Sequence, residues 1–485
     1  MALKNAGSSS CANADFRGLR QSVAMLRRIT RTLAVAAVAM LPVVAGAEQV
    51  PAQSLTLEQM RVLGYQAIGA RRPDVALYIA TRLLDRDPRD AYGHYLKARA
   101  HLDMGQMNAA NAAGRSAFRH AASPTQRFES ARITALSAFN LDQFSTAQWW
   151  LRRAGDTAPN GTDRARTQRD HAAVQARNPL RVALQFSVVP SSNVNNGAGS
   201  RFNIIDGIPV VGVLSPDAQA LAGVVAEADL RASYRVRQSA KSETRLTAGF
   251  NIRDVTLDSA AKAAIAALGP MDFGAQRVEL GATHIYRASP RDQLVLGGLV
   301  GRQWYGGRQN YDFARLSAGM LRAVAERTAV GADAMIEHRN ITNSTRTEHA
   351  FALRASVTQR LRGDGGLLVG ALFYSGHRTT LIGRSSNTVG ASLSWDLGQV
   401  IGPAQVSMNL RASRSLYPDY TIGVIAVPGG RRDDILSAAI SLSFPQVSYA
   451  GFAPMVTISG TRSQSNVSRF TTSERAITLG LRSQF

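Results

Sequence analysis

The feature that most constrains this chain is an alternation of apolar and polar residues with a period of two, which begins at Leu180. In Leu180–Val188 every second residue is apolar, and Arg, Ala, Gln and Ser lie between them. Val389–Leu397 and Ala404–Ala412 repeat the pattern. Because successive side chains of a β-strand point to opposite faces, each segment predicts a strand with one apolar and one polar face.

The number and spacing of these segments indicate what the strands build. About fourteen alternating stretches of about ten residues follow one another, the length a tilted strand needs to cross a bilayer. Short connections fall at 288–291, 362–365 and 445–448, and longer polar ones at about 189–219, 257–272 and 415–432. A soluble sandwich would also alternate, but it would bury one face of each sheet. We therefore expect residues 179–485 to form a 14-stranded antiparallel β-barrel in a lipid bilayer.

Residues 48–178 show no such alternation and are rich in helix-forming Ala, Leu, Arg and Gln. Small residues recur 34 positions apart, as Gly64 and Ala98 do, and Pro88 follows Ala76 by twelve. The pattern resembles the tetratricopeptide repeat, in which small residues let paired helices approach closely and Pro ends the second helix. The alternative is a generic bundle of α-hairpins. Either architecture offers a groove for peptides or partner proteins and no chemistry.

The first 47 residues read as a leader. Arg27, Arg28 and Arg31 precede the apolar run Leu33–Val44, and the small residues Ala45–Ala47 follow. This order predicts a secretory signal peptide at 25–47, whose apolar run is shorter than the ~20 residues of a membrane helix. Whether translation starts at Met1 or at Met25 stays open.

The charge and the cysteine content change once the leader is removed. A formal charge of +22 would by itself suggest nucleic acid, but export argues against that partner. Residues 1–47 hold six basic residues and one acid, so the mature chain carries 22 − 5 = +17. They also hold Cys11, the one cysteine of the sequence, so the mature chain is expected to lack disulfides and thiol chemistry.

Catalytic and metal-binding motifs are missing from the sequence. The eight histidines are scattered without ligand spacing, and there is no H-E-x-x-H, no nucleophile elbow and no Gly-rich phosphate loop. We expect no enzyme activity, no catalytic residue, no cofactor and no metal.

The final segment, Arg475–Phe485, is a strand of the same alternating kind, with Ile477, Leu479 and Leu481 on the face of Phe485. A terminal Phe on such a strand resembles the signal by which barrel-assembly machinery recognises its clients. Phe485 is therefore the predicted assembly signal, and that machinery a predicted partner.

Two further segments carry a family resemblance. The first barrel strand runs into Pro190–Gly197, which contains Asn193, Asn195 and Asn196, and the last hairpin contains Thr461–Asn466 with its Ser465-Asn466 turn. Together with helical repeats before a barrel, these segments resemble the surface lipoprotein assembly modulator (Slam) family, the translocators of the type XI secretion system. The resemblance covers nearly the whole mature chain.

The resemblance implies a function and a location. The barrel would help move a surface lipoprotein or a soluble secreted protein across the outer membrane, with the helical domain in the periplasm. It does not name the substrate or say whether it is lipidated, and it leaves open the plugging of the lumen and the oligomeric state.

The candidate site residues each have a plainer interpretation. The asparagines at 193–196 would contact substrate at the channel mouth or simply form a turn, which we favour. Inward-facing charges would guide a passing chain or pair with one another, which we favour because buried charges must be paired. These charges are Glu227, Asp229, Arg231, Arg235, Arg245, Arg253, Arg354 and Arg411.

Two other functions compete with protein translocation. Some exporters of anionic polysaccharides also join helical repeats to an outer-membrane barrel, and a basic lumen would suit such a polymer. About three repeats is few for that class. The third possibility is a passive pore, in which the repeats would have no purpose.

Overall fold

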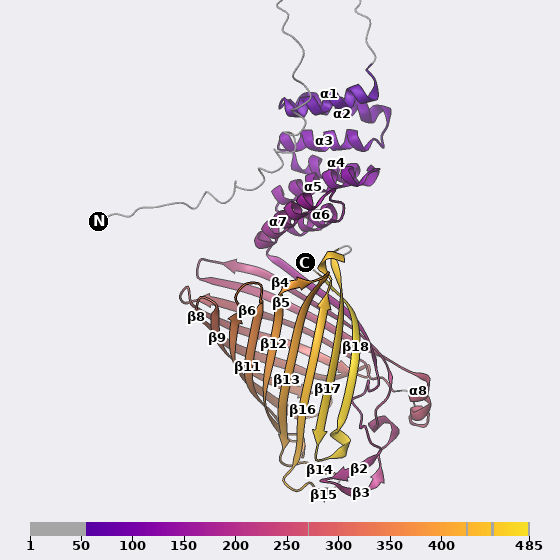
Figure 1. Cartoon of the computed structure of the whole chain (residues 1–485), viewed down its shortest axis with the longest axis vertical. Coiled ribbons are helices and arrows are strands. Elements are labelled where there is room, and N and C mark those ends of the chain that lie inside the picture. Colours follow the sequence, from indigo (N-terminus) through magenta and orange to yellow (C-terminus); the bar gives the residue numbers. More distant parts are fainter. Residues whose placement is uncertain (1–54, 270, 423–424, 448–450, 484–485) are drawn as a thin grey trace, which may run out of the picture. The chain divides into compact units, whose positions relative to one another are not determined.

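The computed structural model describes residues 55–485 except 270, 423–424, 448–450 and 484–485. The predicted signal peptide at 25–47 and the terminal Phe485 lie outside the described residues. The chain splits into two compact units, with the division between Ala176 and Arg177 (Figure 1).

The first unit is entirely helical. Its elements are α1 (Leu57–Gly69), α2 (Pro73–Arg86), α3 (Ala91–Asp103), α4 (Met107–His120), α5 (Pro124–Asn140), α6 (Phe144–Asp156) and α7 (Gly161–Arg177). Local sequence explains where they start: Thr56 and Ser123 form capping boxes with Gln59 and Gln126, and Asp90 accepts hydrogen bonds from the first backbone amides of α3.

The helices stack as successive antiparallel hairpins, as the helical-repeat prediction requires. From α1 to α6 each helix packs against the next, and α1, α3 and α5 also contact one another in order. The small residues of the repeat lie at these crossings, where Ala76, Ala98 and Ala110 are fully buried. Gly64 faces Leu96 so closely that a side chain there would collide with it.

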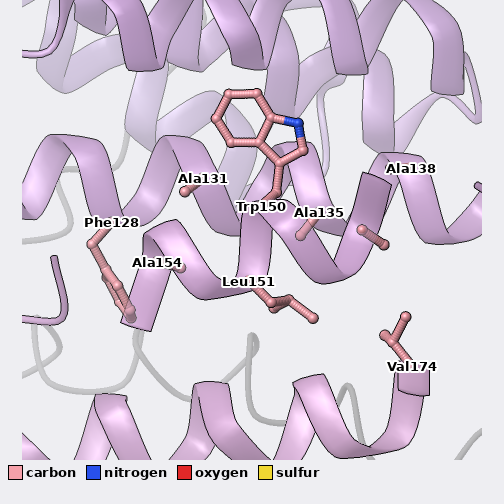
Figure 2. Packing of buried hydrophobic residues seen from close by; sticks show 9 residues of the cluster. Phe128, Ala131, Ala135, Ala138, Trp150, Leu151, Ala154 and Val174 are labelled. Carbon is pink, nitrogen blue, oxygen red and sulfur yellow. The ribbon is translucent and has the colours of Figure 1, made fainter. Parts of the chain in front are cut away.

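The largest core cluster of this unit joins its last three helices. Figure 2 shows Phe128 of α5, Trp150 and Leu151 of α6 and Val174 of α7 around a row of buried alanines. Burying each of the large side chains contributes about 1.5–3 kcal/mol. The alanines let the helices approach, so that the stability of the array comes from close contact of helices rather than from one large core.

The second unit is a closed antiparallel barrel of fourteen strands. The strands are β1 (Leu180–Ser191), β4 (Gly223–Gln238), β5 (Ser242–Leu257), β6 (Ala275–Arg287), β7 (Asp292–Tyr305), β8 (Arg308–Ala325), β9 (Thr328–Ile341), β10 (Thr347–Arg360), β11 (Leu367–Thr379), β12 (Ser386–Ile401), β13 (Ala404–Tyr417), β16 (Arg431–Ser443), β17 (Phe452–Ser465) and β18 (Thr472–Ser483). Neighbours in this order pair along the wall, and β18 pairs with β1 to close it (Figure 1).

The outer face of the barrel is apolar. One outward leucine or isoleucine on each of six consecutive strands exposes more than half of its surface: Leu280, Leu296, Leu316, Ile336, Leu353 and Leu372. A continuous apolar band of this kind is unfavourable in water and suits a bilayer. The predicted fold class, helical repeats followed by a 14-stranded barrel of the outer-membrane type, is confirmed.

The longer connections contain structure that the sequence patterns do not predict. The connection after β1 holds the hairpin β2 (Phe202–Ile205) and β3 (Ile208–Val213), and the one after β5 holds α8 (Ser259–Ile265). The connection after β13 holds the short pair β14 (Thr421–Ile422) and β15 (Ile425–Ala426). Strand β1 also runs on to Ser191, through the region expected to be loop from about residue 189.

No helix in the described part of the chain is long and apolar enough to cross a membrane.

Candidate functional site

The barrel lumen is lined by the polar face of the strands. On β4 and β5 this face carries Glu227 opposite Arg253 and Asp229 opposite Asn251, and Arg231 lies opposite Gly249. Residues two positions apart on a strand share a face, and register partners on neighbouring strands point to the same side of the sheet. The register therefore identifies the lumenal residues of each strand around the wall.

Ion pairs compensate several of the lumenal charges. Glu337 on β9 is the most buried of these groups, at 3% exposed. It accepts a hydrogen bond from Arg315 Nε at 2.8 Å and one from Arg339 Nε at 2.6 Å. A second cluster on neighbouring strands joins Glu348 to His377 at 3.0 Å. Carboxylates held between arginines in this way keep desolvated charges compensated.

Four of the predicted lumenal cations have partners. Arg231 pairs with Asp229 at 2.9 Å, and Arg253 with Glu227 at 3.5 Å. Arg245 pairs closely with Glu243. Arg235 donates a hydrogen bond to the carbonyl of Arg177 at 2.9 Å. This geometry follows the pairing interpretation and leaves open what passes through the lumen.

Arg354 and Arg411 differ from these residues. Neither forms an ion pair with any residue that the structure describes. The guanidinium of Arg411 lies 4.0 Å from the ring centroid of Phe373, and Phe373 is the register partner of Arg354. Phe373 on β11 thus has Arg354 opposite it on β10 and the guanidinium of Arg411, from β13, near its ring. We call Arg354, Phe373 and Arg411 the lumenal arginine cluster.

The asparagines after β1 form a turn. The side chain of Asn193 both donates to Gly197 O at 2.9 Å and accepts from Gly197 N at 2.7 Å. The Asn195 amide donates to Gln219 O at 2.7 Å, and its oxygen accepts from Leu221 N at 3.0 Å. Asn196 has a left-handed backbone with φ of 52°. These side chains therefore hold the ends of the 192–222 loop together.

Asn466 and Ser465 form hydrogen bonds that hold other connections together at the same end of the barrel. Asn466 donates to Gly430 O at 3.0 Å and accepts from Arg432 N at 2.8 Å, which fixes the 418–430 loop. Its own carbonyl accepts from Asp206 N at 2.8 Å. The Ser465 hydroxyl accepts from Val467 N at 3.1 Å.

An apolar cluster lies under these hydrogen bonds. Ile205, Val427 and Val467, from three different connections, are buried against one another, with Phe470 packed beside them. The guanidinium of Arg431 lies 3.3 Å from the Phe470 ring centroid and forms an ion pair with Asp433 at 2.7 Å. We call this assembly of the 192–222, 418–430 and 466–471 connections the loop mouth (Figure 1). Sequence reasoning missed the contact of Arg431 with Phe470, because the two residues are far apart along the chain.

The helical unit carries its own perturbed groups. Burial and the nearby Arg152 lower the pKa of His171 to about 4, and the buried Nε2 of that ring has no hydrogen-bond partner among the described residues. Burial also lowers the pKa of Arg152 to about 10. Arg132 and Asp170 form an ion pair at 3.0 Å in the interior.

One surface of this unit combines arginines with an exposed tryptophan. Arg153 stacks on Trp149 at 3.7 Å, and Arg115 and Arg119 line the same hollow between α4 and α6. Across the described residues, no group of three or more His, Cys, Asp or Glu side chains could hold a metal ion.

The fold and the lumen define a class, an outer-membrane-type β-barrel preceded by a helical-repeat unit. No protein-family model matches the chain, and neither does the sequence of any curated protein.

Solved structures with a similar course of the chain exist for each part. The SycD translocator chaperone of type III secretion from Yersinia enterocolitica is 15% identical over 25% of this chain and 84% of its own, with a TM-score of 0.23. The COG4313 outer membrane channel of Pseudomonas putida F1 is 11% identical over 63% of this chain and 95% of its own, with a TM-score of 0.35. A FadL homologue of Pseudomonas aeruginosa is 9% identical over 64% of this chain and 93% of its own, with a TM-score of 0.36. Scores this low give no information on function.

Proposed function

We propose that this protein is an outer-membrane translocator that helps export a surface lipoprotein or a soluble secreted protein, in the manner of the Slam family. In this proposal residues 1–47 are a leader that is removed, residues 48–178 lie in the periplasm, and barrel-assembly machinery inserts residues 179–485. The partners are the exported polypeptide and the lipid bilayer.

The observation that carries the proposal is the contact between the two connections that follow the segments resembling the family. They lie more than 260 residues apart, yet Ile204 N donates to Ser468 Oγ at 2.8 Å and Ile205 forms a β-bridge with Val467. Two separate sequence likenesses thus belong to one physical assembly, the loop mouth. A pore selected for passive diffusion would not require this coupling.

The ion pairs in the lumen weaken the case for an anionic polysaccharide as the exported substrate. Passage of a polymer that carries repeated negative charges would be favoured by unpaired cations along the lumen. Arg231, Arg245 and Arg253 are instead neutralised by neighbouring carboxylates. These paired arginines therefore do not form a continuous track of free cations.

Deletion of the gene followed by proteomics of the cell surface tests the proposal. We expect one or two exported proteins to disappear from the surface while capsule and other polymers stay intact, and the wild-type gene to restore them. Loss of a polymer with an unchanged set of surface proteins would overturn the assignment. An exported protein encoded beside the gene would identify the first candidate substrate.

A further inference from the structure

The seam between β1 and β18 closes the barrel incompletely. Its described register runs from Gln185 opposite Arg482 to Val188 opposite Leu479 and stops there, although β1 continues to Ser191 and β18 begins at Thr472. On its other edge β18 stays paired with β17 as far as Thr472 opposite Ser463. The segment Thr472–Thr478 therefore has a ladder partner on one side only.

The sequence explains why β1 leaves this edge open. Pro190 lies where β1 would continue the ladder opposite Ile477, and proline has no backbone N–H to donate. The turn that follows, held by Asn193 and Gly197, then directs the chain toward the loop mouth. One side-chain hydrogen bond joins the two strands here, from Ser191 Oγ to Glu474 Oε1 at 2.6 Å.

An open strand edge has a physical consequence. Unpaired backbone N–H and C=O groups cost several kcal/mol each in hydrocarbon and form a template for another strand. Edge strands commonly take up an extended peptide by main-chain hydrogen bonding. The Ser191–Glu474 hydrogen bond is a single polar contact between the two strands, and an incoming peptide would have to displace it.

We propose that the β18 edge Thr472–Thr478 is a lateral docking site for an extended segment of the exported polypeptide, which pairs with β18 as β1 moves away. The inference rests on the proposed function and deepens it. The occupant is a strand with alternating character, because Ile477 faces outward beside Leu479 while Glu474 and Thr478 face the lumen. A basic side chain opposite Glu474 would take over the place of the Ser191 hydroxyl.

A disulfide that locks the seam tests the movement. In Ser187→Cys/Gly480→Cys the two positions are register partners, and a Cβ built on Gly480 lies 3.7 Å from Ser187 Cβ, within the range of a disulfide. The same Cβ lies 2.8 Å from Phe186 O, so the strands must shift slightly to accept it. The matched control is Ser441→Cys/Thr457→Cys across β16 and β17, whose hydroxyls are 2.8 Å apart. Both are made in a Cys11→Ser background. Retention of the folded band on unboiled gels shows that each barrel assembles.

We expect the seam disulfide to lower the surface level of the exported protein about tenfold and a reductant to restore it, with the control pair at wild-type level. The exported protein is the one lost from the surface in the deletion strain. Normal export with a fully oxidised seam would overturn the docking site. No loss in the deletion strain would instead overturn the proposed function, so the two failures are distinguishable.

A photo-crosslinking amino acid tests occupancy without relying on the disulfide. It is placed at Thr478, on the open edge, and for comparison at its register partner Thr457, which is paired on both sides. We expect the exported protein to be captured from position 478 and not from 457. Capture of barrel-assembly components alone from 478 would show that the edge serves insertion only and would overturn the proposal.

Discussion

Arg132 on α5 and Asp170 on α7 form an ion pair in the interior of the helical unit, with Nη2 and Oδ2 3.0 Å apart. Burial raises the pKa of Asp170, while Arg132 opposes that shift. The pair joins the third hairpin to the helix that closes the array.

Removal of one partner of this pair should destabilise the helical unit. We expect Arg132→Met to lower the free energy of unfolding by about 3–5 kcal/mol, because it leaves the Asp170 carboxylate buried without its cation. Urea unfolding of the full-length protein in detergent, followed by circular dichroism at 222 nm, measures the loss. The double variant Arg132→Met/Asp170→Leu should recover most of it. Equal instability of the single and double variants would contradict this account.

The helical unit should also lose stability in mild acid. The pKa of His171 is lowered to about 4 in the folded protein, against 6.5 for an ordinary histidine. The unfolded chain therefore binds a proton between pH 6.5 and 4 that the folded unit does not, so stability falls as the pH falls through this window. Melting temperatures at pH 7 and pH 4.5 measure the effect, and His171→Phe should reduce the difference. An unchanged difference in that variant would assign the acid sensitivity to other groups.

A glycine at a helix crossing should not accept a side chain. A Cβ on Gly114 of α4 would collide with the Thr134 hydroxyl of α5, so Gly114→Val should cost about 1–3 kcal/mol through overpacking. Gly155 of α6 is the control, because its Cβ would meet no atom closer than Thr167 Cγ2 at 4.0 Å. Gly155→Ala should be neutral or stabilising, since alanine favours helix. Similar losses in both variants would contradict close approach at Gly114 as the cause.

The carboxylate of Glu337 should be needed for the barrel to fold stably. It compensates both Arg315 and Arg339, and Glu337→Gln leaves Arg315 without an ion pair and Arg339 with only the more distant Glu348, at 4.0 Å. We expect the folded band on unboiled gels to be lost at a lower temperature than in wild type. Glu227→Gln, at a longer and more exposed pair with Arg253, should shift that temperature less. The reverse order would show that burial does not set the importance of these pairs.

The lumenal arginine cluster should influence which ions pass. Among the described residues neither Arg354 nor Arg411 forms an ion pair, although Asp333 is the register partner of Arg354 on β9, so replacing both arginines by Glu should move the lumen toward cation selectivity. The reversal potential in planar bilayers under a salt gradient measures this change. Replacement of the ion-paired Arg277 by Gln is the comparison, and an equal shift there would remove any special role of the cluster.

The barrel wall could be predicted because its signal is local. The alternation at Leu180–Val188 or Val389–Leu397 needs only neighbouring residues to show which face meets lipid, and both segments pair in the wall as expected. The helical crossings at Gly64 and Ala76 were visible for the same reason, since close packing requires small residues at a fixed spacing.

The loop mouth could not be predicted because its partners are distant. Nothing around Val467 indicates that it will be buried against Ile205 and Val427, and the hairpins within the long connections depend on those contacts. The extension of β1 through Pro190 was missed because proline usually marks a loop. Here Pro190 pairs with β4 on one side, and the edge of β1 that faces β18 makes no further ladder bonds. The charge of single residues likewise did not reveal which lumenal arginines are paired.

The hydrogen bonds of Asn466 join pieces of chain that are separated along the sequence by two barrel strands or by nearly the whole barrel. An antibody raised against this region would consequently recognise a discontinuous epitope and lose its binding on boiled protein. Insertion of a peptide tag at 342–346, outside these bonds, should be tolerated, whereas the same tag beside Asn466 should abolish recognition of all three connections at once.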